Sequence, residues 1–153
     1  MRAGLAFVVL GGLIVAQPVG AAPTQWVDYY ATTIHGPTSL SAGVSGTYEL
    51  GVANAGNQPG SLELFIIFTG AIDQTGRIVA PGFDCEVRHD AGINAAIRCT
   101  KSVFQPDSPA KVIFQARGQA AGTGKIGAVL NPHRSAVEGN YNNNNSTLTV
   151  TVH

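Results

Sequence analysis

A carboxylate followed by several asparagines near the C-terminus is the main concentration of oxygen ligands in the sequence. In the segment "VEGNYNNNNS", Glu138 is followed by Asn140, Asn143 and Asn144. Calcium prefers carboxylate and amide oxygens, takes about six to eight of them, and binds tightly when several are charged. Because Glu138 is the only carboxylate nearby in the sequence, these four residues predict at best a weak calcium site.

The same asparagines allow two other interpretations. Asparagine tolerates positive φ and its side chain bonds to nearby backbone, so the run suits a turn that leads into a final strand. We favour this turn over the calcium site. Asn144 and Asn145 also stand in N-glycosylation sequons, a signal that any asparagine-rich segment generates easily.

Three aromatic residues, Trp26, Tyr29 and Tyr30, lie together in "WVDYY". Exposed aromatic rings form stacking platforms for sugars or anchors for protein partners, so these residues are candidates for partner binding. We favour the alternative, in which Trp26 and Tyr30 pack on the edge of the sandwich. Substitution of Trp26 separates the two, because a platform would lose binding while the fold stays intact.

Residues that could carry catalysis do not stand in recognisable patterns. The four histidines form no HxH or HExxH motif, "GVSG" at 43–46 is one residue short of a nucleophile elbow, and "GTGK" at 122–125 lacks the spacing of a phosphate loop. Asp84 and Glu86 would share one strand face, which we expect to be solvated. The sequence therefore predicts a protein that is not an enzyme, with no catalytic residue, no cofactor and no confident metal site. A hydrolase site assembled from distant residues is the remaining alternative.

The two cysteines, Cys85 and Cys99, predict a disulfide if the chain is exported. Closing a loop of this size would stabilise the fold by about 3 kcal/mol in the chain-entropy model. Two buried thiols are the alternative. A zinc site is disfavoured because no CxxC pair is present.

The elements that must position these residues are strands. Short stretches rich in Val, Ile, Phe, Tyr and Thr alternate with Gly, Pro, Asn and Asp clusters, which predicts an all-β fold, an Ig-like β-sandwich of about seven to eight antiparallel strands. The expected strands are residues 26–34, 46–54, 61–70, 83–87, 95–100, 110–118, 124–132 and 146–152. Turns are expected at Thr75-Gly76 and at Pro81-Gly82.

The N-terminus predicts export. Arg2 precedes an apolar run from Ala3 to Ala16, and small residues follow, which is typical of a signal peptide cleaved after Ala21 or Ala22. We expect residues 1–21 to be this signal peptide and residues 22–153 to form one domain, secreted or held at the cell envelope, without a membrane span. A retained membrane anchor is the alternative. The sequence holds nine basic and nine acidic residues without clusters, so binding to nucleic acid is not expected.

Three segments resemble a known family. "GTYELGVANAGNQPG" contains a V-x-N-x-G pattern after an alternating strand, "CEVRHDAGINAAIRCT" resembles a cysteine-containing hairpin, and an acid-x-N-x-x-N-N motif precedes the last strand. Residues 46–152 thus resemble the cell-adhesion-related (CARDB-type) domain of bacterial surface proteins. The resemblance implies a secreted β-sandwich with recognition or scaffold duties and no catalytic role. We expect it to bind a protein or cell-envelope partner. A structural, self-assembling secreted protein is the second interpretation.

Overall fold

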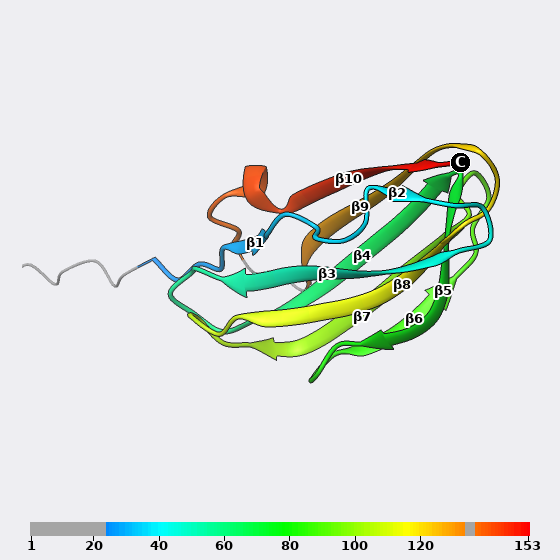
Figure 1. The fold of residues 1–153 in the computed structure, drawn as a ribbon. Coiled ribbons are helices and arrows are strands. Elements are labelled where there is room, and N and C mark those ends of the chain that lie inside the picture. The colour runs from blue at the N-terminus through cyan, green and yellow to red at the C-terminus, as the bar shows by residue number, and fades with distance from the viewer. Residues whose placement is uncertain (1–23, 134–136) are drawn as a thin grey trace, which may run out of the picture.

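The fold, described for residues 24–133 and 137–153 of a computed structural model, consists of two β-sheets packed face to face (Figure 1). The predicted signal peptide, residues 1–21, lies outside the described residues. The strands and the single 3-10 helix of the described residues are β1 Tyr29–Ala31, β2 Ser39–Leu40, β3 Ser45–Asn54, β4 Gly60–Gly70, β5 Ile72–Val79, β6 Asp84–Arg88, β7 Ala95–Phe104, β8 Ala110–Gly118, β9 Gly122–His133, η1 Tyr141–Asn143 and β10 Asn145–Val152.

The strand orders confirm the predicted β-sandwich and correct its details. The smaller sheet has the order β1-β3-β8-β5, and the larger one has the order β2-β10-β9-β4-β7-β6. Neither β2 nor β5 was expected from the sequence. The expected strands all pair with one another in antiparallel fashion, as predicted, and the unexpected β2 pairs in parallel with β10.

Alternating side chains of β3 and β4 build the centre of the core, as their period of two predicts. Tyr48 and Leu50 of β3 belong to the same core cluster as Leu64 and Phe68 of β4, and all are fully or almost fully buried. Phe114 of β8 stacks with Tyr48 and meets Phe68 edge-on, at centroid distances of 5.7 Å in both cases. Each such side chain contributes about 1.5–3 kcal/mol by its burial.

The expected turn at Thr75-Gly76 is wrong. Strand β5 continues through both residues, and the register against β8 shifts between Thr75 and Val79. Gly76 takes a φ of 64°, so the glycine that resembles a turn signal lies in an irregular part of β5, where residues 76–78 oppose Phe114 alone. The expected turn at Pro81-Gly82 is present, with Gly82 at a φ of 75°.

The first predicted strand, residues 26–34, is wrong in length, because the segment runs along the opening between the two sheets. Only β1 in its middle pairs with β3. Before it, Val27 bridges to Glu138, and after it the Ile34 amide donates to Ser146 Oγ of β10 at 3.2 Å. The segment therefore contacts both sheets instead of extending one of them.

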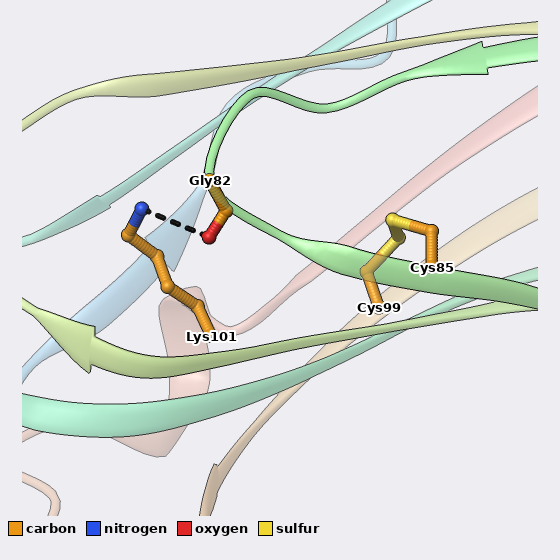
Figure 2. The surroundings of a disulfide bond; sticks show 4 residues. All are labelled: Gly82, Cys85, Cys99 and Lys101. Carbon is orange, nitrogen blue, oxygen red and sulfur yellow. Dashed lines mark hydrogen bonds between the residues drawn. A yellow bond between two sulfur atoms is a disulfide. The ribbon is translucent and has the colours of Figure 1, made fainter.

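The predicted disulfide between Cys85 and Cys99 is confirmed (Figure 2). The two cysteines face each other across the β6–β7 hairpin, as directly paired residues. Beside them, Lys101 Nζ donates to the Gly82 carbonyl at 3.3 Å and lies 5.0 Å from the centroid of the Phe83 ring. These contacts fasten the turn that precedes β6 to β7.

Candidate functional site

The loops at one end of the sandwich are joined by the side chain of Asn54, at the end of β3. Its Oδ1 accepts from the amides of Asp28 and Gly56, at 3.1 and 2.9 Å. Its Nδ2 donates to the carbonyls of Gln58 and Phe104, at 2.9 and 3.1 Å. Asn54 is fully buried, and these four bonds connect the segment before β1, the β3–β4 loop and the end of β7. We call this end, made of residues 24–28, 55–59, 105–109 and 137–144, the loop end.

Two glycines let the loop end close around the segment before β1. A Cβ on Gly56 would lie 2.5 Å from the Trp26 carbonyl oxygen and 2.6 Å from Val27 Cα. A Cβ on Gly139 would lie 2.7 Å from Trp26 Cζ3. Position 56 therefore requires glycine for the close approach of backbone, whereas a side chain at Gly139 would force the Trp26 ring to shift. The Gly56 requirement, together with the bonds of Asn54, gives the V-x-N-x-G pattern its physical basis.

The connection into β10 is fixed by backbone pairing and by a cap. The Val27 amide donates to the Val137 carbonyl at 2.9 Å, and the Gly139 amide donates to the Val27 carbonyl at 2.7 Å. Asn140 caps η1, because its Oδ1 accepts from the Asn142 amide at 3.0 Å. The predicted turn thus takes the form of one 3-10 turn between Gly139 and β10. Figure 1 shows η1 and β1 together at the end opposite the C-terminus.

Three of the four predicted calcium ligands come together beneath this turn. Glu138 and Asn144 are 8% and 3% exposed, and Asn143 is half-buried. Glu138 Oε1 accepts from the Tyr29 amide at 3.1 Å, and Asn144 Nδ2 donates to the Leu130 carbonyl at 3.2 Å. The fourth residue, Asn140, uses its side-chain oxygen for the cap. The burial of Asn144 also leaves no room for a glycan on it.

Asp28 is a second carboxylate at this place, which the sequence analysis missed. Asn143 Nδ2 donates to Asp28 Oδ1 at 2.9 Å, across 115 positions of the sequence. No local sequence signal could have identified Asp28, because β1 and η1 meet only in the folded chain. We call Asp28, Glu138, Asn143 and Asn144 the acid–amide cluster.

The acid–amide cluster leaves three buried oxygens without a hydrogen-bond partner among the described residues: Glu138 Oε2, Asn143 Oδ1 and Asn144 Oδ1. Burial raises the pKa of Glu138, and the negative charge of Asp28 adds to this effect. The backbone amides of Tyr29 and Asn140 and the Asn144 side chain lie close enough to the carboxylate to oppose the rise. The cluster therefore combines excess negative charge with unused acceptors.

The three predicted partner-binding aromatics lie in three different surroundings. Tyr29 is fully buried, its ring stacks on Phe104 at 6.0 Å, and its hydroxyl donates to the Ser61 carbonyl at 3.2 Å. The expectation that Tyr29 offers an exposed ring is wrong, because its side chain faces the core. Burial raises the pKa of its hydroxyl to about 12. Tyr30, half-buried, points to the opposite side and borders a shallow depression beside Pro109.

Trp26 lies at the loop end, half-buried against Gly139. Two exposed apolar side chains flank the acid–amide cluster there: Val137 is 60% exposed and Tyr141 is 64% exposed. Neither Val137 nor Tyr141 was expected from the sequence, since single apolar residues in a loop give no signal. We call Trp26, Val137 and Tyr141 the loop-end patch.

The residues considered for catalysis lie on solvated surface. Asp84 and Glu86 are exposed on β6, and Glu86 pairs with Arg98 at 3.3 Å. Arg98 also pairs with Glu63 at 2.6 Å. Within residues 24–133 and 137–153, no three His, Cys, Asp or Glu side chains gather as a metal-binding group, so any cation there would need amide oxygens as well. The same residues contain no helix long and apolar enough to cross a membrane.

The chain resembles solved structures in fold. The sequence matches no family model and no curated protein. The CARDB domain of a Pyrococcus furiosus protein, crystallised in complex with di-metal ions, aligns with a TM-score of 0.58 at 19% identity, over 84% of this chain and 90% of that one. Its solution structure aligns with a TM-score of 0.60 at 18% identity, over 84% and 97%. A cohesin module from a family 33 glycoside hydrolase of Clostridium perfringens aligns with a TM-score of 0.53 at 14% identity, over 85% and 98%. The likeness confirms that the chain has the β-sandwich fold of CARDB domains.

Proposed function

We propose that the chain is an exported, non-enzymatic β-sandwich module that binds a protein or cell-envelope partner through its loop end. The observation that carries the proposal is the loop-end patch. Single exposed apolar side chains are common on protein surfaces, but Val137, Tyr141 and the half-buried Trp26 lie on neighbouring segments. Tyrosine and tryptophan are the residue types enriched at the centres of protein interfaces.

The loops that carry this patch are well fixed, which favours recognition. Asn54 bonds to four backbone groups at the base of the loop end. Val27 forms backbone hydrogen bonds with Val137 and Gly139, the residues on both sides of Glu138. A rigid scaffold that presents loops at one end is the usual arrangement of binding sites on β-sandwiches. A partner would meet a surface that is already ordered, which lowers the entropy cost of binding.

Export is supported by the N-terminal pattern and by the disulfide. Arg2, the apolar run after it and the small residues up to Ala22 are typical of a signal peptide. Disulfides persist in oxidising compartments, and Cys85–Cys99 is compatible with such a location.

Self-assembly through sheet edges is less favoured. The edge strand β6 presents Asp84, Glu86 and Arg88 to solvent, and charges on an edge discourage pairing with another copy. Size-exclusion chromatography with light scattering should therefore give a monomer. A stable oligomer would favour the assembly interpretation.

The proposal is tested by crosslinking the tagged protein in its native host and quantifying captured partners by mass spectrometry. A variant with Val137→Ser and Tyr141→Ser should lose the partners that the unchanged protein captures. The matched control is Val44→Ser, since Val44 is 50% exposed and lies before β3, at the other end of the sandwich. If the loop-end variant keeps every partner, or if the control loses the same ones, the loop end is not the binding surface. A substrate that the purified protein turns over would contradict the non-enzymatic part.

A further inference from the structure

We propose that the acid–amide cluster is a binding site for a calcium-like divalent cation, with Glu138, Asn143 and Asn144 as ligands and Asp28 as a second negative charge. The inference concerns the oxygens beneath the loop-end patch and does not depend on the proposed partner. It begins from three buried oxygens, Glu138 Oε2, Asn143 Oδ1 and Asn144 Oδ1, that find no donor among the described residues.

The orientation of the Asn143 and Asn144 side-chain amides is fixed by the hydrogen bonds that their nitrogen atoms donate. The Asn143 amide nitrogen must face Asp28, because a carboxylate accepts and cannot donate. The Asn144 amide nitrogen must face the Leu130 carbonyl for the same reason. Rotating either side-chain amide by half a turn would place its oxygen against another acceptor, and the hydrogen bond would be lost. These constraints leave the two amide oxygens without a donor. Glu138 Oε2 also has no hydrogen-bond partner among the described residues, although the Asn140 amide and the Asn144 side chain lie near enough to the carboxyl group to lower its pKa.

Three hydrogen-bond acceptors in one buried cluster need more than a proton on Glu138 or a single buried water can supply. Protonation of Glu138 would add one donor, and one buried water would add two. A water would leave the charges of Glu138 and Asp28 unbalanced, and protonation of Glu138, which the nearby charge of Asp28 favours, would supply a donor to only one of the two amide oxygens. A divalent cation would satisfy all three oxygens and balance both charges.

The ligand types select the class of cation. Carboxylate and amide oxygens are hard ligands that favour calcium, magnesium or manganese, and the cluster offers no sulfur or imidazole for zinc or copper. Magnesium demands near-ideal octahedral geometry and gives up its water reluctantly, whereas calcium accepts irregular sets of protein oxygens. With two charges and only three free protein oxygens, we expect a dissociation constant of about 0.1–1 mM, as in other extracellular calcium sites.

Such an ion would also tie together segments that are distant in the sequence. Asp28 leads into β1, Glu138 belongs to the connection after β9, and Asn144 leads into β10. Val137 and Tyr141 of the loop-end patch lie within three residues of Glu138. Occupancy would therefore stabilise the turn that carries the exposed apolar side chains.

Equilibrium unfolding of the purified protein in urea, with and without calcium, tests the inference. At about 10 mM free calcium, this affinity should raise the ratio of folded to unfolded protein about 10- to 100-fold over a salt control of equal ionic strength. Magnesium should raise it less. The variants Glu138→Gln and Asn143→Ala should lose the calcium response, and Glu86→Gln, which changes an exposed carboxylate on β6, should keep it.

A second readout guards against variants that fail to fold. Terbium, which has similar ligand preferences, should give luminescence when Trp26 is excited, and added calcium should displace it. Asn143 is half-buried, so we expect Asn143→Ala to fold and to remain testable even if Glu138→Gln does not fold. The proposal fails if calcium leaves the ratio of folded to unfolded protein at its salt-control value. It also fails if Glu138→Gln and Asn143→Ala respond to calcium as strongly as the unchanged protein.

Discussion

Replacement of Asn54 by alanine should unfold the loop end more than any other single exchange of a polar residue there. The side chain of Asn54 is fully buried, and its four hydrogen bonds all go to backbone groups: the amides of Asp28 and Gly56 and the carbonyls of Gln58 and Phe104. Alanine would leave all four groups without their partner. At about 1 kcal/mol for each lost bond, with an added cost for groups that stay buried, the free energy of unfolding should fall by about 3–5 kcal/mol. That is a large fraction of the about 5–15 kcal/mol of a typical domain.

The assay is urea unfolding followed by circular dichroism and by Trp26 fluorescence, with the midpoint lowered and the slope unchanged. The matched control is Asn57→Ala, in the same loop. Asn57 is exposed and also bonds to backbone, through Trp26 N at 3.0 Å and the Thr24 carbonyl at 3.0 Å. Because water can replace those bonds, the control should cost less than about 1 kcal/mol. If Asn54→Ala costs no more than Asn57→Ala, the role assigned to Asn54 is refuted.

Three other predictions follow from the same contacts. Replacing Cys85 and Cys99 together by alanine should lower the free energy of unfolding by about 3 kcal/mol, measured in urea, because the disulfide spans a sequence separation of 14. Burial raises the pKa of Tyr29 from 10.0 to about 12, so only the unfolded chain ionises between these values; the free energy of unfolding should be intact below pH 10 and fall as the pH rises to 12. A Tyr29→Phe variant with the same slope over this window would contradict that assignment. Burial also raises the pKa of Glu138, so without calcium the free energy of unfolding should fall as the pH rises from 4.5 through the raised value, whereas Glu138→Gln should show no such fall.

The sheets were largely predictable because they depend on local alternation. Leu64, Ile66 and Phe68 share one face of β4 in any strand, and that face is buried in the structure. The disulfide was predictable for a similar reason, since the short loop between β6 and β7 brings Cys85 and Cys99 into register.

Glycine gave a misleading signal where two structures require the same φ. Thr75-Gly76 fits a turn or an irregularity within a strand equally well, because both can use a positive φ at glycine. The choice between them is made by β8, which pairs with β5 on both sides of the irregularity. A partner strand about 40 positions away in the sequence cannot be identified from local pattern alone.

The loop end was the least predictable part, because its contacts join residues far apart in the sequence. Tyr29 was expected to be available to a partner, but β1 turns it inward onto Phe104. Asp28 was not recognised as part of the acid–amide cluster, because its contact with Asn143 exists only in the folded chain. Asn54 gave a sequence signal through V-x-N-x-G, but the pattern alone does not say that one side chain joins three segments.

A crystal structure of the protein grown in calcium, with anomalous scattering data, would test the acid–amide cluster most directly. If the cluster binds calcium, an anomalous peak is expected in contact with Glu138 Oε2, Asn143 Oδ1 and Asn144 Oδ1. A cluster that instead shows a protonated Glu138 or a bound water bonded to these oxygens, with no ion at saturating calcium, would contradict the proposal.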